Sequence, residues 1–325
     1  SAVNKEGYEG TSSALDITPT YSGPVWWVST TGNDDTGDGG TGKPFKSLKH
    51  AIEHVTAGDT VMLKKGTYTG SDNRGIALTT NSNIDFANLK NVVITSEEGA
   101  ANTIIHANDQ DRHLTISGNQ TKTIDSTFQI IGLTFTGGKR SDYGGSVAIF
   151  GESYTNPNNT TQRLTTHMQP KFKDCVFIDN QVTSNNGGHG GAVYIENAAP
   201  IFESCVFDSN YANGAGGAVD IGGESTTDGD TVWVYKSTFK NNWVDDDGTS
   251  NKISTNGGAI NLRHGMLIVI ANSTFEKNMV IAKNSDHGSH GGAISINRSW
   301  NTKTRPLIRI ANSRFTKNIN RSEFG

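Results

Sequence analysis

The chain has 325 residues, of which 33% are hydrophobic, 18% are charged and 38 are glycine. This composition is too apolar for a disordered chain and too polar for a membrane-spanning one. The 28 Lys and Arg residues nearly balance the 32 Asp and Glu residues, and no basic run or long apolar tract is present. We therefore expect neither nucleic-acid binding nor membrane insertion by this segment.

The first 24 residues are polar and without periodicity, which predicts an irregular N-terminal arm before a single domain over 25–325. A short capping helix is predicted over about 44–55. It begins with a proline and has five apolar residues on one face, namely Phe45, Leu48, Ala51, Ile52 and Val55. Early strands follow at 59–64, 91–95, 103–106, 113–117 and 127–135. The helix is expected to cover the open first coil of a solenoid.

Two motifs alternate in the second half of the chain. Phe-x-x-Asn occurs at Phe177/Asn180, Phe207/Asn210, Phe239/Asn242, Phe275/Asn278 and Phe315/Asn318, at steps of 30, 32, 36 and 40 residues. Gly-Gly-Ala-(Val/Ile) blocks lie between them at 190–193, 216–219, 257–260 and 291–294. Constant motifs at variable spacing indicate fixed strands that are joined by loops of variable length.

Each repeat contains three short apolar strands: one after the glycines, one before the Phe and one ending in the Phe. Three strands per coil, stacked coil on coil, predict an all-β fold, a right-handed parallel β-helix with regular coils over about 127–325. Equivalent residues then repeat about every 4.8 Å along the axis. We expect the five Phe side chains to form a buried column. The five Asn side chains should form a ladder at a turn that tolerates left-handed backbone geometry, each bonded to backbone groups and to the next Asn.

Cys175 and Cys205 occupy one position of these stacked coils, which Ser237, Ser273 and Ser313 share in later coils. Two stacked, reduced thiols are predicted. A disulfide is the alternative, because the coil spacing allows it, but parallel Cβ vectors fit its geometry poorly.

Two resemblances follow from these motifs. The segments 26–33, 42–48, 57–63 and 66–68 resemble the N-terminal cap and first coil of the pectin-lyase-like β-helix superfamily. From residue 171 onward, the repeats resemble those of polymorphic outer-membrane proteins, whose β-helical passengers serve adhesion on bacterial surfaces. This second resemblance implies an extracellular or bacterial cell-surface location. Residues 319–325 contain no cap, so we expect further parts of a longer chain at the C-terminal end.

Strand alternation sends one row of side chains outward, Tyr194, Asp220, Asn261 and Ser295, beside a second row of Glu196, Gly222, Arg263 and Asn297. In β-helix lyases such a face carries calcium-binding carboxylates and an Arg or Lys base. If the chain is a lyase, Asp220, Arg263 and Glu196 are the catalytic candidates. We expect roughly 8 Å between Asp220 and Arg263, enough room for a sugar. Ordinary solvent-facing alternation explains the same pattern.

Two histidines precede Gly-Gly pairs, and His189 lies in a Gly-His-Gly sequence that resembles a short polygalacturonase motif. His189 and His290 are expected three coils apart, about 14 Å, which is too far to share a proton or a metal. The aspartate pairs of polygalacturonases are absent at matching places, since residues 245–247 are expected in a loop. Both histidines are therefore interpreted as solvated loop residues.

Calcium is the one cofactor that the sequence suggests. Acidic loops supply oxygen ligands at short spacing, namely Asp34, Asp35 and Asp38, then Asp228 and Asp230, and finally Asp245, Asp246 and Asp247. Turn formation by Asp and Gly is the alternative explanation.

Two functions remain. The first is a secreted or cell-surface β-helix that binds a polysaccharide or a surface protein, or acts as a spacer, without turnover. The alternative is a polysaccharide lyase or glycoside hydrolase that acts on an acidic polysaccharide along the β-helix face.

Overall fold

The computed structural model describes residues 2–3, 9–10, 24–82, 84–223, 231–246, 255–263, 265–283, 288–297 and 306–322. Within the predicted N-terminal arm, β1 (Ala2–Val3) pairs with β2 (Glu9–Gly10) in antiparallel fashion. In the described part of the chain, no helix has the length and apolar character needed to cross a membrane.

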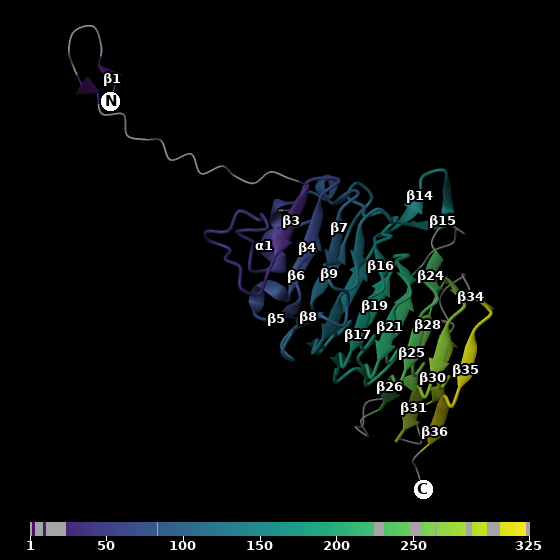
Figure 1. Cartoon of the computed structure of the whole chain (residues 1–325). Helices are drawn as coiled ribbons and strands as arrows, with labels where there is room; N and C mark the ends of the chain where they lie inside the picture. Colours follow the sequence, from purple (N-terminus) through teal and green to yellow (C-terminus); the bar gives the residue numbers. More distant parts are fainter. Residues whose placement is uncertain are drawn as a thin grey trace.

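Four parallel sheets run along the axis of the molecule, and each successive coil adds one strand to each sheet (Figure 1). Sheet I contains β3 (Val25–Val28), β4 (Thr60–Leu63), β7 (Val93–Ser96), β10 (Gln129–Ile131), β16 (Lys171–Lys173), β20 (Ile201–Glu203), β24 (Thr231–Tyr235), β29 (Leu267–Ala271) and β34 (Leu307–Ala311). Sheet II contains β5 (Gly66–Tyr68), β8 (Thr103–His106), β11 (Thr134–Thr136), β17 (Val176–Ile178), β21 (Val206–Asp208), β25 (Thr238–Lys240), β30 (Thr274–Glu276) and β35 (Arg314–Thr316).

The other two sheets complete each coil. Sheet III contains β12 (Lys139–Arg140), β18 (Gln181–Val182), β22 (Tyr211–Ala212), β26 (Trp243–Asp245), β31 (Met279–Ala282) and β36 (Ile319–Ser322). Sheet IV contains β6 (Ile76–Thr79), β9 (Leu114–Ser117), β13 (Val147–Phe150), β19 (Val193–Glu196), β23 (Val219–Gly222), β28 (Ile260–Arg263) and β33 (Ile294–Asn297). The predicted right-handed parallel β-helix is confirmed.

The regular coils contain one strand more than the sequence predicts, because the strands of sheet III follow the ladder Asn residues. These strands are as short as two residues. A two-residue strand is too short to show alternation, so the sequence contains no separate signal for it.

The remaining elements lie at the ends of the stack or between coils. They are α1 (Leu48–His54), the 3-10 helices η1 (Ser71–Asn73) and η2 (Phe86–Leu89), the antiparallel hairpin β14 (Ser153–Asn156) and β15 (Asn159–Thr165), and the short parallel pair β27 (Thr255–Asn256) and β32 (Ser289–His290). The hairpin projects from the stack in Figure 1.

Helix α1 packs at the N-terminal end of the stack, as the capping-helix prediction requires (Figure 1). It begins later than the predicted residue 44, because Phe45 forms a β-bridge with Val28. The Ser47 side chain then caps the helix by accepting a hydrogen bond from the backbone N–H of His50.

The predicted Phe column is present and begins one coil earlier than the motif suggests, at Phe135. From Phe135 to Phe315, successive rings lie 4.5 to 5.4 Å apart, with their planes within 17° of parallel. A second stacked pair, Phe172 and Phe202, packs edge-on against the column. The prediction that all five rings are buried is wrong for Phe315, which is 43% exposed because it lies in the last coil described.

The Asn ladder lies just behind this column and is buried in its middle coils. From Asn210 onward, the Oδ1 atom of each Asn accepts two hydrogen bonds from the Asn of the preceding coil. For the pair Asn210 and Asn242 these bonds measure 3.0 Å from the backbone N–H and 2.9 Å from Nδ2. The Nδ2 group of Asn210 also donates to the carbonyl oxygen of Phe177 at 2.9 Å. The predicted bonds to the backbone and to the next Asn are therefore both present.

Asn180 departs from the predicted ladder, because it has no Asn below it. It is fully buried, and its backbone N–H and Nδ2 donate to Oδ1 of Asn210 at 3.1 and 3.0 Å, as the ladder requires. The preceding coil has Gly138 in the equivalent place, so Oδ1 of Asn180 accepts from the Gly138 backbone N–H at 2.9 Å instead of from another side chain. Its Nδ2 donates to the carbonyl oxygen of Phe135 at 3.1 Å. Asn180 thus begins the ladder and joins it to the backbone of an earlier coil.

The left-handed backbone geometry expected at the ladder Asn residues, Asn180 included, lies one position earlier instead. The residue before each Asn has a positive φ of 53 to 55°, at Asp179, Ser209, Asn241, Lys277 and Lys317. An Asn in extended geometry can direct its carboxamide along the axis to the next coil, whereas the residue before it makes the sharp turn. The ladder thus fixes a strained turn in register.

Cys175 and Cys205 are buried and free, so the predicted reduced thiols are present and the disulfide is not formed. Each thiol donates to backbone carbonyl oxygens, Cys175 to Ile130 and Cys205 to Phe172. Burial raises the pKa of the Cys205 thiol well above its ordinary value.

His113 is a buried polar side chain between two sheets. Its Nδ1 lies 2.9 Å from the Ser146 hydroxyl, and its Nε2 lies 3.0 and 3.1 Å from the carbonyl oxygens of Ile105 and Thr136. Nε2 therefore donates to carbonyl oxygens while Nδ1 accepts from the hydroxyl, an arrangement that suits the neutral ring. Burial lowers the pKa of His113 to about 4.

This buried imidazole should make stability fall on acidification. The unfolded chain binds a proton at the ordinary pKa of 6.5, so protonation favours unfolding between pH 6.5 and about 4. We expect a loss of about 3 kcal/mol across that range, which chemical denaturation at pH 7 and pH 4.5 should detect. The control is His113→Gln, which does not titrate. Equal losses in both proteins would assign the effect to other groups.

Candidate functional site

The predicted outward rows lie on sheet IV, where the strand register aligns them. Tyr194 pairs with Asp220, Asp220 with Asn261, and Asn261 with Ser295. In the neighbouring row Glu196 pairs with Gly222, and Arg263 pairs with Asn297. The side chains of three successive coils therefore converge on one polar cluster.

Arg263 is the centre of this cluster. Its Nε donates to Oδ2 of Asp220 at 2.8 Å, and its Nη2 donates to the Tyr194 hydroxyl at 2.7 Å and to Oε2 of Glu196 at 3.1 Å. The Tyr194 hydroxyl also donates to Glu196 at 2.7 Å. The expected 8 Å gap between Asp220 and Arg263 is wrong, because the long Arg side chain folds back along the sheet. No sugar fits between the two groups.

A glycine makes this fold-back possible. At Gly222 an added Cβ would lie 2.7 Å from Oε2 of Glu196 and 3.0 Å from Cζ of Arg263. Any larger side chain would therefore displace either the guanidinium or the carboxylate. Gly222 is thus required for the ion pair that crosses the coil between β19 and β28.

Burial and charge decide the protonation states in the cluster. Asp220 is fully buried, which alone would raise its pKa, but the charges of Arg263 and His189 and the Asn261 hydrogen bond hold the pKa well below its usual range. Burial lowers the pKa of Arg263, but the Asp220 charge outweighs it and raises that pKa above the ordinary value. Burial raises the pKa of Tyr194 as well. At neutral pH Asp220 is therefore ionised, Arg263 is protonated and Tyr194 is neutral.

The chain of contacts continues into the next coils. Asn261 donates to Oδ1 of Asp220 at 2.6 Å, and Asn297 donates to Oδ1 of Asn261 at 2.8 Å. Ser295 lies 3.5 Å from Asn297 and is nearly buried. Five of the six predicted ligand-face residues thus form one connected network with Glu196, and Ser295 lies at its edge.

The interpretation of His189 as a solvated, unconnected loop residue is wrong. Its Nδ1 is buried and lies 3.6 Å from Oδ2 of Asp220, with no partner within hydrogen-bond distance among the described residues. The strand-like pairing of His189 with Tyr143 and with Ala215 brings the ring to the edge of sheet IV. His189 and Asp220 therefore form a loose dyad beside the guanidinium.

Tyr143 is a member of the site that the sequence patterns did not indicate. Its ring stacks on Tyr194 at 4.5 Å and lies 5.9 Å from the His189 ring, while 41% of the residue is exposed. A signal was present, since Tyr143 precedes a Gly-Gly pair at 144–145 just as His189 precedes one at 190–191. Ser146 in place of Ala hides this earlier copy of the block.

His290 lies three coils from His189, as predicted, through the pairings of Ala215 and Asn256. Its Nδ1 lies 3.1 Å from Oδ1 of Asn256, so the interpretation of His290 as a residue without a partner is also wrong. The strand pairing of β27 with β32 places these two side chains side by side.

The loop predicted at 245–247 is wrong for Asp245, which ends strand β26. Its carboxylate accepts from the Tyr211 hydroxyl and from the Lys283 ammonium group, both at 2.6 Å. Asp246 is buried and accepts from the backbone N–H of Lys283. Asp247, Asp228 and Asp230 lie outside the described residues.

The other acidic loop is organised by its own turns. Asp34 accepts from the backbone N–H groups of Lys46 and Ser47, and Asp38 accepts from that of Gly40. The Asp35 N–H donates to the Asn33 side chain. Within the described residues, no group of three or more His, Cys, Asp or Glu side chains could hold a metal ion. Calcium stays a prediction.

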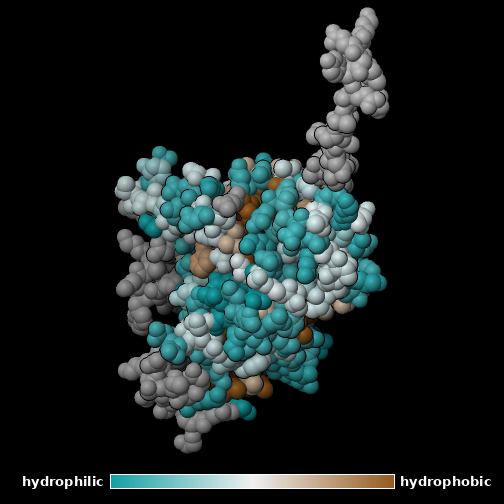
Figure 2. Space-filling view, turned by 90° about the vertical axis from the view of Figure 1, so that its left-hand side faces the viewer, coloured by the Kyte–Doolittle hydropathy of each residue, from teal (hydrophilic) through white to brown (hydrophobic). Residues whose placement is uncertain are grey.

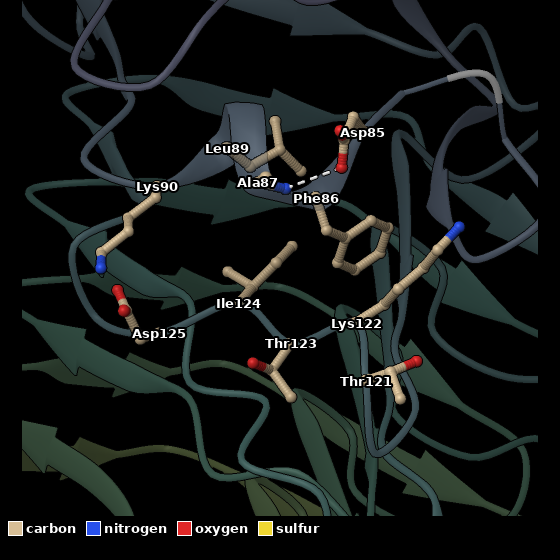
Figure 3. Close-up of a pocket in the computed structure, with 10 residues that line it drawn as sticks. All are labelled: Asp85, Phe86, Ala87, Leu89, Lys90, Thr121, Lys122, Thr123, Ile124 and Asp125. Atoms are coloured by element: carbon tan, nitrogen blue, oxygen red, sulfur yellow. Dashed lines mark hydrogen bonds between the residues drawn. The ribbon is translucent and has the colours of Figure 1, made fainter.

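A pocket of about 290 Å³ lies elsewhere, between η2 and residues 121–125 (Figure 3). Phe86, Leu89 and Ile124 supply apolar lining, while Lys90 and Asp125 approach each other at one edge. No residue of the Arg263 cluster lines this pocket. The surface shown in Figure 2 is predominantly hydrophilic with small apolar patches.

No family model matches the chain. A segment of 82 residues is 39% identical to "Uncharacterized protein YwoF" of Bacillus subtilis (strain 168), and it spans 25% of this chain and 17% of that protein. The chain thus covers less than a fifth of the length of this curated relative.

Three solved structures are similar in fold. A rhamnogalacturonan lyase is 13% identical with a TM-score of 0.37, over 88% of this chain and 87% of that one. The GH136 lacto-N-biosidase from Eubacterium ramulus is 11% identical with a TM-score of 0.34, over 93% and 68%. The complex of XylC with xylose is 8% identical with a TM-score of 0.29, over 90% and 68%. The predicted pectin-lyase-like resemblance is confirmed at the level of the fold. Function has to be inferred from the residues of this chain.

Proposed function

We propose that the chain is an extracellular β-helix that binds a polysaccharide along the outward face of sheet IV without cleaving it. The observation that carries this proposal is the state of Arg263, the residue that the lyase hypothesis needs as a base. A base must be unprotonated, whereas Asp220 raises the pKa of Arg263 and holds its guanidinium in a fixed position. The cluster suits a rigid binding wall better than a proton acceptor.

Tyr143 supplies the contact that a sugar ring needs. Its exposed ring is supported from behind by Tyr194, which in turn is fixed by Arg263 and Glu196. An aromatic face held rigidly beside polar groups is typical of ligand sites that lose little conformational entropy on binding. Two carboxylates face one guanidinium here, so the charge balance favours a neutral polysaccharide over one rich in uronates.

Binding to immobilised neutral and acidic polysaccharides tests this proposal. Tyr143→Ala should weaken retention on the neutral ligand at least about tenfold, equivalent to the loss of about 1.4 kcal/mol. The matched control is Trp233→Ala on sheet I, because Trp233 is similarly exposed at 45% but lies on another face. Equal losses in the two variants, or no retention of the unmodified protein, would contradict the proposal.

The His189–Asp220 dyad favours a second candidate, a polysaccharide-cleaving enzyme. A buried ionised Asp can orient a His for proton transfer, and the exposed ring of Tyr143 lies next to this His. Incubation with pectate, alginate and chondroitin, with calcium added, should then release products that absorb near 235 nm or new reducing ends. The release should disappear in His189→Ala and persist in His290→Ala. Binding without any product would exclude this candidate for the ligand tested.

A further inference from the structure

The C-terminal end of the stack exposes residues that are buried in every preceding coil. β33, β34, β35 and β36 are the last strands of their sheets among the described residues, so each pairs on one side only. The inward-facing residues Ile296, Ile310 and Phe315 are 46%, 47% and 43% exposed. Their counterparts one coil earlier, Leu262, Ile270 and Phe275, are fully buried. The core is therefore open at this end.

The hydrogen bonds of the two ladders have a direction that reaches this end unfinished. In each coil the Asn backbone N–H and Nδ2 donate forward to Oδ1 of the next Asn, up to the bonds from Asn278 to Asn318 at 3.0 and 2.8 Å. Asn318 itself donates from Nδ2 to the carbonyl oxygen of Phe275, but in the described part of the chain its backbone N–H has no acceptor. The backbone N–H of Ser273 likewise donates forward to the Ser313 hydroxyl, and the N–H of Ser313 has no described acceptor.

These donors specify what fits the end. A complementary surface must carry a carboxamide or carboxylate oxygen above Asn318, a hydroxyl oxygen above Ser313 and an apolar ring above Phe315. A second copy of this chain fails this requirement in both orientations. Tail-to-tail packing would place donors against donors, and head-to-tail packing is blocked because α1 packs at the opposite end.

We propose that the C-terminal end of the stack binds a further coil of the same Phe-x-x-Asn type, continuing in the same polypeptide from β36. This coil adds one parallel strand to each sheet, places its Phe ring on Phe315 and accepts the two forward hydrogen bonds of Asn318. The interface is the one already formed between the coils of Phe275 and Phe315, where the rings lie 4.7 Å apart within 3° of parallel.

The test appends a second copy of residues 288–322 after Ser322 and measures amide hydrogen exchange in β34–β36. Exchange should slow at least about tenfold relative to the unextended chain, because these edge amides become paired. Two matched extensions serve as controls: one in which the appended counterpart of Asn318 is replaced by Ala, and one of the same length with scrambled sequence. The first should retain only part of the protection, and the second none.

Exchange in β19–β25 verifies that each extended protein is folded. The proposal is overturned if the intended extension gives no protection in β34–β36 while β19–β25 stay protected. It is also overturned if the unextended chain sediments as a dimer whose formation protects the same amides, because a second copy would then be the occupant. The polysaccharide-binding proposal does not depend on either outcome, since sheet IV residues 143–263 lie in earlier coils.

Discussion

Replacing Phe239 by alanine is expected to lower the free energy of unfolding by about 3 to 5 kcal/mol, the usual cost of removing a fully buried aromatic ring. The Phe239 ring lies between those of Phe207 and Phe275, at 4.5 and 4.8 Å. Its loss leaves a cavity with ring faces on both sides. The rigid coil spacing keeps those neighbours from closing it, because the strands are hydrogen-bonded on either side. Chemical denaturation followed by circular dichroism measures the effect.

The same substitution at Phe315 supplies the control. Phe315 has a ring on one side only, and nearly half of it is exposed. We expect Phe315→Ala to cost about 1 kcal/mol or less, since most of its transfer free energy is not gained in this structure. Similar losses at the two positions would mean that the column is not the continuous core that the ring distances indicate.

The fold could be predicted because the repeats put the same residue type at the same place in every coil. A Phe three residues before an Asn, five times in succession, has a simple physical explanation when coils stack in register. The start of the ladder was less predictable, since Gly138 replaces Asn in the coil before Asn180 and only its backbone N–H takes part. The short strands of sheet III could not be predicted either, because two-residue strands are too short to alternate.

The site was predictable in its rows but not in its contacts. Alternation correctly places Asp220 and Arg263 on one face, since a strand has only two faces. It says nothing about the direction of a long side chain. Arg263 bends toward Glu196 because Gly222 leaves space there, and that depends on three coils at once. The positions of Tyr143 and His189 depend on loops whose path the sequence pattern does not determine.

Replacing Arg263 by alanine is expected to destabilise the protein by about 3 to 5 kcal/mol, the range for breaking a buried ion pair by removing one partner. Asp220 has no exposed surface, and in the variant it would keep only the Asn261 hydrogen bond and the more distant His189. A buried carboxylate without its cation must either remain ionised at high cost or bind a proton. The Tyr194 hydroxyl would lose its guanidinium contact as well.

The pH dependence and a second substitution separate this cause from a simple loss of packing. Arg263 holds the pKa of folded Asp220 below the ordinary 3.8, so the stabilisation is present above about pH 4 and is lost as the pH falls through the folded pKa. The deficit of Arg263→Ala, measured by denaturation, should therefore shrink as the pH falls below about 4. Asp220→Asn combined with Arg263→Ala should be more stable than Arg263→Ala alone at pH 7, because no unpaired charge remains buried. Additive losses in the double variant, or a deficit that is constant with pH, would show that Arg263 acts through its aliphatic contacts alone, and the charged wall proposed for polysaccharide binding would lose its basis.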